Sequence, residues 1–148
     1  MSENQKKKYQ FICSRGTLDG AYPSLVLALN TVRLGHQATI FYTFFGLDVI
    51  KKGGAERLKF YPLGPMGAIP GMPQLASSMM RKQVEEANIP DIPTMLELCM
   101  LEGVQFVACH MTMEMMKIKR DEIIDGVIVM TAEQFLQQAA DCQINMFT

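Results

Sequence analysis

The chain has 148 residues, and its 14 lysines and arginines against 15 aspartates and glutamates leave a net charge of -1. A chain of this length forms one domain with a sizeable core and needs no disulfides to fold. The charge balance excludes a general attraction to nucleic acid, and no apolar run approaches the ~20 residues that span a bilayer, so we expect neither nucleic acid nor a membrane as a partner.

The N-terminus is polar and lacks the apolar stretch of a secretory signal, so we expect residues 1–8 to be disordered and the protein to be cytoplasmic. Thiols stay reduced in that compartment, and the cysteines form no CxxC pair. We therefore predict free thiols at Cys13, Cys99, Cys109 and Cys142.

The first half of the chain alternates between strand and helix patterns. Residues 9–14 are aromatic and β-branched, which predicts a strand, and residues 22–34 carry apolar side chains at helical spacing up to Gly35. Residues 38–44 form a second, continuously apolar strand. Continuous apolarity indicates burial on both faces, as in a parallel sheet.

The middle of the chain is richer in helix. A short helix is expected over 47–52, and further helices over 75–87 and 93–102. Residues 61–75 hold four prolines and three glycines, which predicts a long loop. We expect its part from 62 to 73 to cover a pocket or to pack between subunits, because long apolar loops are unfavourable in solvent.

The last third completes an α/β pattern. Residues 104–109 read as a buried strand, and Thr112 is expected to cap a short helix that runs to Lys117. The remaining elements are a strand over 126–130, a helix that starts at Thr131 and an edge strand over 143–148. The alternation predicts a single α/β domain over residues 1–148, with a mostly parallel sheet of about five strands flanked by helices.

Ligands of such sheets bind outside the carboxyl ends of the strands. This rule brings together residues 13–19, 43–48 and 109–112. Cys109 ends a strand beside a predicted helix start, where the helix dipole favours the reactive thiolate. The alternative is that Cys109 is a small buried core residue, since free cysteines are often buried.

Two other thiols are candidates for a supporting role. Cys99 lies on a helix that is apolar almost all round, which favours packing, although it is also a candidate second thiol that relays sulfur to Cys109. Cys13 ends the first strand and is a candidate for the same pocket. Arg15 lies in a glycine-containing loop that lacks nucleotide-binding spacing, so we expect no nucleotide cofactor but consider a small anion there.

The methionines suggest an alternative function. Cys109, His110, Met111 and Met113, with Cys99, are ligand types that suit Cu(I), which would make the chain a non-catalytic soft-metal binding protein. Methionine more often fills gaps in packing, and His110 has no recognised zinc spacing, so we expect no metal. A third possibility is an interaction subunit whose thiols are incidental.

The stretch "GVQFVACHMTMEMMKIKRDEIIDGVIV" resembles the DsrE/DsrF-like family, specifically its DsrE-like sulfur-transfer proteins with an A-C-x-M-[ST]-M motif. The resemblance extends to "SRGTLDGAYPSLVLALNTVRLGHQATIFYTFFGLDVIKKG" and "PGMPQLASSMMRKQVEEANIPDIPTMLELC", and so to nearly the whole chain. It implies a DsrE-like three-layer fold, homo-oligomers and a cysteine that carries sulfur as a persulfide or thiosulfonate group.

By motif, that carrier is Cys109. The resemblance implies a cytoplasmic sulfurtransferase or stoichiometric sulfur carrier without a cofactor, with a TusA-like carrier and a rhodanese as partners, in sulfur oxidation or sulfur trafficking. Arg15, His110, Met111 and Thr112 are the expected contacts of the bound group, with Cys99 and Cys13 as further thiols. Relatives often have glutamine at the position of His110, so the role of this side chain stays open.

Overall fold

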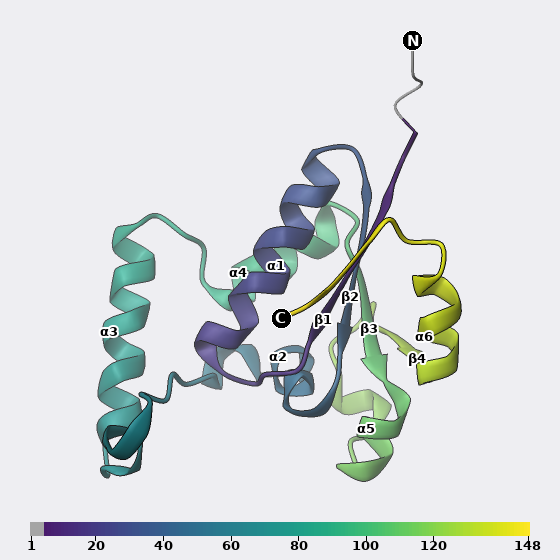
Figure 1. Ribbon diagram of the computed structural model, residues 1–148. Coiled ribbons are helices and arrows are strands. Elements are labelled where there is room, and N and C mark those ends of the chain that lie inside the picture. Colours follow the sequence, from purple (N-terminus) through teal and green to yellow (C-terminus); the bar gives the residue numbers. More distant parts are fainter. Residues whose placement is uncertain (1–4) are drawn as a thin grey trace.

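The computed structural model describes residues 5–148, so the disorder expected for residues 1–4 lies outside this range. Within it, five strands form one parallel sheet in the order β4-β3-β2-β1-β5 (Figure 1). The strands are β1 (Lys8–Cys13), β2 (Gln37–Tyr42), β3 (Gln105–Cys109), β4 (Ile128–Met130) and β5 (Ile144–Phe147). The predicted α/β fold is confirmed, and the sheet is wholly parallel. Lys8, expected in the disordered segment, pairs with Gln37 in β1.

Helix α1 (Leu18–Arg33) starts a full turn earlier than the predicted Tyr22. Thr17 caps it by accepting a hydrogen bond from the Gly20 N–H. Pro23 lies inside the helix, near its start, where its missing N–H costs the helix a single intrahelical bond. The sequence "RGTLDG" reads as a loop, but the cap makes its second half helical.

Between β2 and β3 the chain forms α2 (Leu47–Ile50), α3 (Met72–Glu86) and α4 (Ile92–Leu101). The stretch expected to be a loop over 61–75 contains a 3-10 helix, Gly64–Ala68, and the start of α3, with Pro73 in the first turn of that helix. This correction follows from proline's fixed φ, which suits helix starts as well as loops.

The two later helices differ in how they begin. Helix α6 (Ala132–Ala139) begins where predicted, and Thr131 is its cap, since the Thr131 hydroxyl accepts a hydrogen bond from the Gln134 N–H. The predicted cap of α5 (His110–Met115) is wrong, because the helix starts directly after Cys109 and contains Thr112 in its interior.

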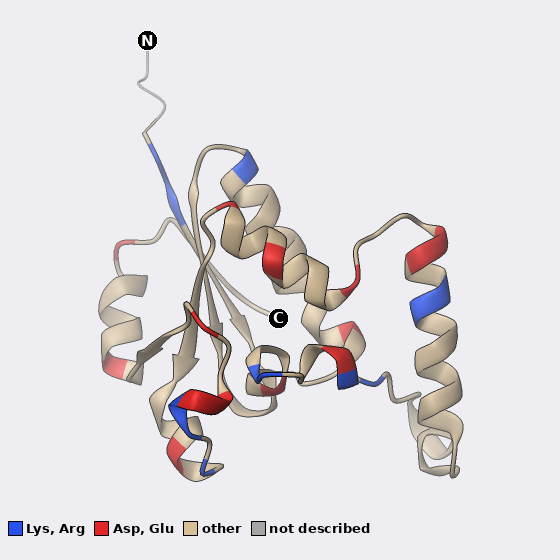
Figure 2. Cartoon of the chain, turned by 180° about the vertical axis from the view of Figure 1, so that it is seen from behind, with Lys and Arg blue, Asp and Glu red and all other residues tan. Residues whose placement is uncertain are grey.

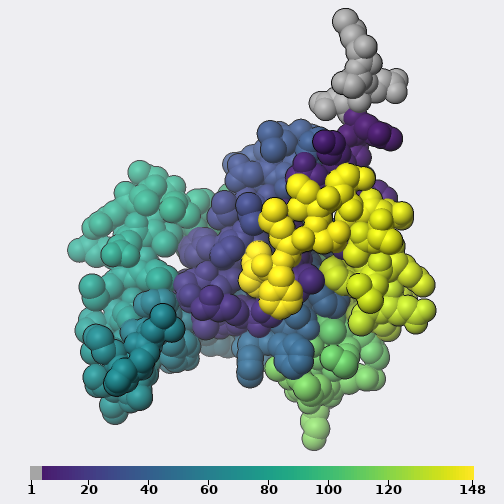
Figure 3. All heavy atoms as spheres, in the orientation of Figure 1, coloured from purple at the N-terminus to yellow at the C-terminus, as the bar shows by residue number. Residues whose placement is uncertain are grey.

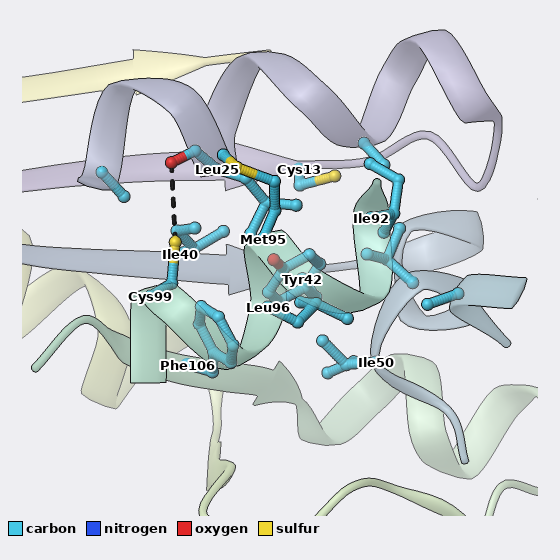
Figure 4. Packing of buried hydrophobic residues seen from close by; sticks show 14 of the residues in the cluster. Cys13, Leu25, Ile40, Tyr42, Ile50, Ile92, Met95, Leu96, Cys99 and Phe106 are labelled. Atoms are coloured by element: carbon cyan, nitrogen blue, oxygen red, sulfur yellow. Dashed lines mark hydrogen bonds between the residues drawn. The ribbon is translucent and has the colours of Figure 1, made fainter. Parts of the chain in front are cut away.

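Helices cover the sheet unequally. Helices α1, α2 and α4 pack on one face and form the main core, part of which is drawn in Figure 4. Helix α6 lies over the other face (Figure 1), where a small buried cluster contains Phe41, Val107, Cys109 and Phe135. The sheet therefore separates a large core from a small one.

Residues 60–86, which we call the arm, project from this body (Figure 3). The Arg81 guanidinium donates to the backbone carbonyls of Glu56 and Leu58, which ties the middle of α3 to the segment before the arm. A cleft of about 620 Å³ lies between the arm and the body, lined among others by Tyr22, Val84 and Ile92. None of the helices formed by residues 5–148 has the length and apolarity needed to cross a membrane.

Candidate functional site

The carboxyl ends of β1, β2 and β3 meet at one edge of the sheet, as predicted, because these strands are parallel neighbours. Cys109 is the last residue of β3 and pairs in register with Met130 of β4. It is also the residue from which α5 begins, with extended backbone at φ -71° and ψ 116°. The chain thus changes from strand to helix at Cys109.

The thiol of Cys109 is covered, with 2 % of the residue exposed. Ile12 and Met130 pack against the small cluster that Cys109 shares with Phe41 and Phe135. The rings of Phe41 and Phe135 stack with their centroids 4.1 Å apart. Phe135 is buried, whereas its neighbour Leu136 is exposed, so α6 covers the cysteine through an aromatic anchor.

The structure does not bring Cys99 or Cys13 to Cys109. Both of these cysteines belong to the main core, where Figure 4 labels them. Because side chains alternate between the faces of a strand, Cys109 lies on the opposite face, in the small cluster. The Cys99 thiol donates to the Leu25 carbonyl at 3.6 Å, and the Cys13 thiol contacts the Gly20 carbonyl at 3.7 Å.

The chemistry of these two thiols also differs from that of a reactive cysteine. Burial, reinforced by the nearby Glu102 carboxylate, raises the pKa of Cys99 from its ordinary 9.0 to about 12. Burial likewise raises the pKa of Cys13. A thiol with a raised pKa is rarely ionised at neutral pH, and the thiolate is the nucleophile. Packing is therefore the role that this structure supports for both.

Thr112 is wholly buried, and its hydroxyl is already engaged. Its Oγ1 accepts a hydrogen bond from the Phe44 N–H at 3.1 Å and lies 3.2 Å from the Thr43 Oγ1. Phe44 has a φ of +48°, an uncommon conformation for a residue other than glycine. Thr112 thus holds the turn after β2 beside the end of β3.

The two residues that follow Cys109 face solvent. Met111 is exposed, and the His110 side chain is half exposed with its Nε2 at 3.7 Å from the Glu114 Oε1, one turn along α5. Both are close to Cys109 in the chain and are free to contact an incoming group. They are the predicted contact residues next to Cys109 in the chain that the structure leaves accessible.

Arg15 lies at the carboxyl end of β1, in the predicted loop. Its Nη2 donates to the Asp19 carboxylate at 2.7 Å, and the side chain is largely exposed. A shallow pocket that Arg15 lines also contains Gly16, Thr17 and Tyr61. An anion there must compete with Asp19 for the guanidinium.

The candidate copper ligands are dispersed. Met113 and Cys99 are buried in the main core, while Cys109 lies in the small cluster on the other face. Within residues 5–148, no group of three or more histidine, cysteine or acidic side chains is arranged to hold a metal ion.

Sequence reasoning missed the residues that cover the thiol, chiefly Phe41 and Phe135. The one available signal was Phe135, the aromatic residue of the helix after Thr131. The sequence does not show that this helix crosses the sheet with Phe135 facing Cys109. Thr43 was within the predicted edge, although its contact with Thr112 was not foreseen.

Comparison with known proteins identifies a matching family and two similar sequences. The DsrE/DsrF/DrsH-like family matches residues 5–147. A protein of Allochromatium vinosum named sulfur carrier protein DsrE2 is 32 % identical, over 97 % of this chain and 99 % of its own. The uncharacterized protein YrkE of Bacillus subtilis is 27 % identical, over 97 % of this chain and 98 % of its own.

Two solved structures share the fold. The ychN protein of E. coli superposes with a TM-score of 0.53 and 15 % identity, over 97 % of this chain and all of its own. Protein MTH1491 of Methanobacterium thermoautotrophicum, described as of unknown function, gives a TM-score of 0.50 and 13 % identity, over 95 % and 99 % of the two chains. The resemblance inferred from the sequence is confirmed, and the chain belongs to the DsrE/DsrF/DrsH-like family.

Proposed function

We propose that this chain carries sulfur in transit, with Cys109 as the residue that holds it. The observation that carries the proposal is the position of this thiol, at the carboxyl edge of a parallel sheet and apart from the thiols of the main core. The similarity to a named sulfur carrier supports the same role.

In the loading step, the Cys109 thiolate attacks the outer sulfur of a donor persulfide or polysulfide. A new S–S bond forms at Cys109, the donor's S–S bond breaks, and the donor leaves as a thiolate. In the unloading step, a partner thiolate attacks the outer sulfur, and Cys109 is released as a thiolate. Electrons balance in both steps, so no oxidant or cofactor is required.

His110 and Met111 are the side chains that we assign to contact the bound group, since both are accessible beside Cys109. Arg15 is a candidate for an anionic group such as a thiosulfonate. We further propose a TusA-like carrier as the acceptor and a rhodanese as a donor, in cytoplasmic sulfur oxidation or trafficking. The chain would act as a homo-oligomer and as a stoichiometric carrier or a sulfurtransferase.

Intact mass spectrometry tests the assignment. The reduced protein is exposed to polysulfide and, separately, to tetrathionate, and is weighed beside Cys109→Ser. We expect the wild type to gain sulfur and the variant to gain none at this position, with reversal by a small thiol such as dithiothreitol. Equal gain by the Cys109→Ser variant would refute Cys109 as the carrier.

A further inference from the structure

The part of the arm formed by residues 60–80, which we call the apolar tip, carries an unusual surface. It contains no lysine, arginine, aspartate or glutamate. Figure 2 shows this uncharged stretch at the lower end of the arm, with the charged residues of α3 confined to its other end. The large apolar or aromatic side chains that the tip exposes are Tyr61, Leu63, Met66, Ile69, Leu75 and Met79.

This exposure is more than scattered surface hydrophobicity. Leu63 is 95 % exposed and so makes almost no contact within the chain. A concentration of apolar side chains on one projecting segment marks a binding surface, because monomeric proteins rarely expose such patches to water. The tip does not cover Cys109, contrary to one of the two roles expected for the loop, since Cys109 is covered from α6.

Hydrogen-bonding capacity distinguishes between the possible occupants. A protein interface of ordinary size contains about ten hydrogen bonds. In the tip, the Ser77 hydroxyl is paired with the Pro73 carbonyl and the Phe60 N–H, and the Ser78 hydroxyl with the Gln74 carbonyl. Tyr61 and Gln74 are the polar side chains that remain for a partner. A surface so poor in polar groups suits hydrocarbon better than protein.

The backbone of the tip also favours an apolar environment. Prolines at 62, 65, 70 and 73 have no N–H, which removes four donors that would otherwise need a partner in an apolar medium. Some of the other backbone N–H groups form hydrogen bonds within the tip. The Ile69 N–H donates to the Met66 carbonyl, and the Met72 N–H donates to the Ile69 carbonyl. The cost of removing this segment from water is reduced accordingly.

Positive charges flank the tip on both sides. Arg57 and Lys59 precede it, and Arg81 and Lys82 follow it. The two flanks meet in space, because Arg81 donates to the Leu58 carbonyl. Glu56 precedes these cations, and Glu85 and Glu86 lie about one turn further from the tip on α3, where the Lys82 Nζ is 3.9 Å from the Glu86 Oε1. The residues next to the tip in the chain are therefore cationic, with four cations against three carboxylates in the neck as a whole. Long cationic side chains beside an apolar segment are suited to anionic lipid headgroups.

We propose that the apolar tip inserts into the interfacial region of an anionic lipid bilayer, with the cationic neck at the headgroups. The binding is peripheral, by a short segment about 5–10 Å deep. In Figures 1 and 2 the tip and α5 lie at the same end of the molecule, the end to which the strands point. Insertion would therefore turn the edge that holds Cys109 toward the membrane. Membrane binding by the tip does not require sulfur transfer at Cys109.

Vesicle co-sedimentation tests the proposal with vesicles of phosphatidylcholine alone and mixed with phosphatidylglycerol. The tip variant is Leu63→Ser, Met66→Ser and Leu75→Ser together, and the matched control is Leu34→Ser with Leu101→Ser, two exposed leucines outside the arm. We expect the wild type and the control to bind the mixed vesicles, and the tip variant to bind at least ~10-fold less. Arg57→Gln with Lys82→Gln should weaken binding to the mixed vesicles selectively.

A fluorescence measurement checks the depth directly, because the chain has no tryptophan. The emission of Leu63→Trp should shift to the blue on addition of mixed vesicles, while that of Leu101→Trp should not. The proposal is overturned if the wild type stays in solution with both kinds of vesicle, or if the tip and control variants bind equally. It is also overturned if the tip variant reduces the molecular mass in solution, by light scattering, with vesicle binding unchanged, since the tip would then be a contact between copies.

Discussion

Cys99 and Cys109 lie on opposite faces of the same sheet, so the backbone of the sheet separates their sulfur atoms. A relay of sulfur from one thiol to the other within one chain would have to pass through the main core. The structure therefore makes Cys109 independent of the thiol that sequence reasoning placed second.

The first prediction follows from this separation. Replacing Cys99 by alanine removes a buried thiol from the main core but leaves the surroundings of Cys109 intact. We expect Cys99→Ala to gain as much sulfur from polysulfide as the wild type, measured by intact mass spectrometry. A loss of loading in a variant with wild-type circular dichroism would instead reveal a relay.

The second prediction concerns the cover over Cys109. Phe135→Ala removes the stacked ring that anchors α6, which should reduce the free energy of unfolding by about 3–5 kcal/mol. Local opening of α6 then exposes the thiol. We expect alkylation of Cys109 by iodoacetamide to be at least ~10-fold faster than in the wild type.

Two controls make this measurement specific. Leu136→Ala changes the exposed neighbour of Phe135 and should leave the alkylation rate unchanged. Cys99, in the main core, reports global unfolding, because its thiol is buried with α1 and α4. If Cys99 and Cys109 become reactive at the same rate, the whole chain has opened and α6 is not a separate cover.

The third prediction concerns Thr112. Thr112→Val keeps the shape of the side chain but leaves the Phe44 N–H without its acceptor, which should cost about 1–3 kcal/mol. Thr112→Ser retains the hydroxyl and should cost less. Urea unfolding measures both, and a Thr112→Ser variant that is less stable than Thr112→Val would show that the methyl group contributes more than the hydrogen bond.

The fourth prediction concerns pH. The pKa of Cys99 is about 12 in the folded chain against an ordinary 9.0, so the unfolded state loses this proton first as the pH rises. The contribution to stability is complete below about pH 9 and is lost above it, by at most roughly 1.4 kcal/mol per pH unit.

Urea unfolding of the wild type and of Cys99→Ala between about pH 8 and about pH 10 measures this loss. The wild type should lose more stability than the variant over this range. Both proteins retain Cys13 and Tyr42, whose pKa values are also raised by burial, so their contribution cancels in the comparison. A difference between the two proteins that stays constant with pH would contradict the assignment.

Much of the fold could be predicted because buried strands have distinctive sequences. The continuously apolar runs around Ile40 and Val107 lie in central strands, and their carboxyl ends define the edge that holds Cys109. The start of α1 was missed because Thr17 caps the helix within a sequence of loop-forming residues.

The details of the site depend on information that is not local. Because side chains alternate along a strand, the sequence shows that Val107 and Cys109 share a face of the sheet. It does not show that α6 crosses this face while α4, which carries Cys99, packs on the other. Threonine is a residue type that often caps helices, but the Thr112 hydroxyl instead accepts a hydrogen bond from Phe44, in the turn after β2. The net charge also gave no indication of the apolar tip. Residues 60–80 contain no charged side chain, and the charges in the rest of the chain nearly cancel.

The order of strands has a consequence for how the chain folds during synthesis. Strand β1 lies inside the sheet, between β2 and β5. Its Tyr9 pairs with Ile144 of β5, so strands from the two ends of the sequence are neighbours. Until residues 144–147 have emerged, one edge of β1 has no partner and is open to pairing with another nascent chain. The sheet is completed by its last strand, so a synthesis pause before β5 would leave an aggregation-prone intermediate.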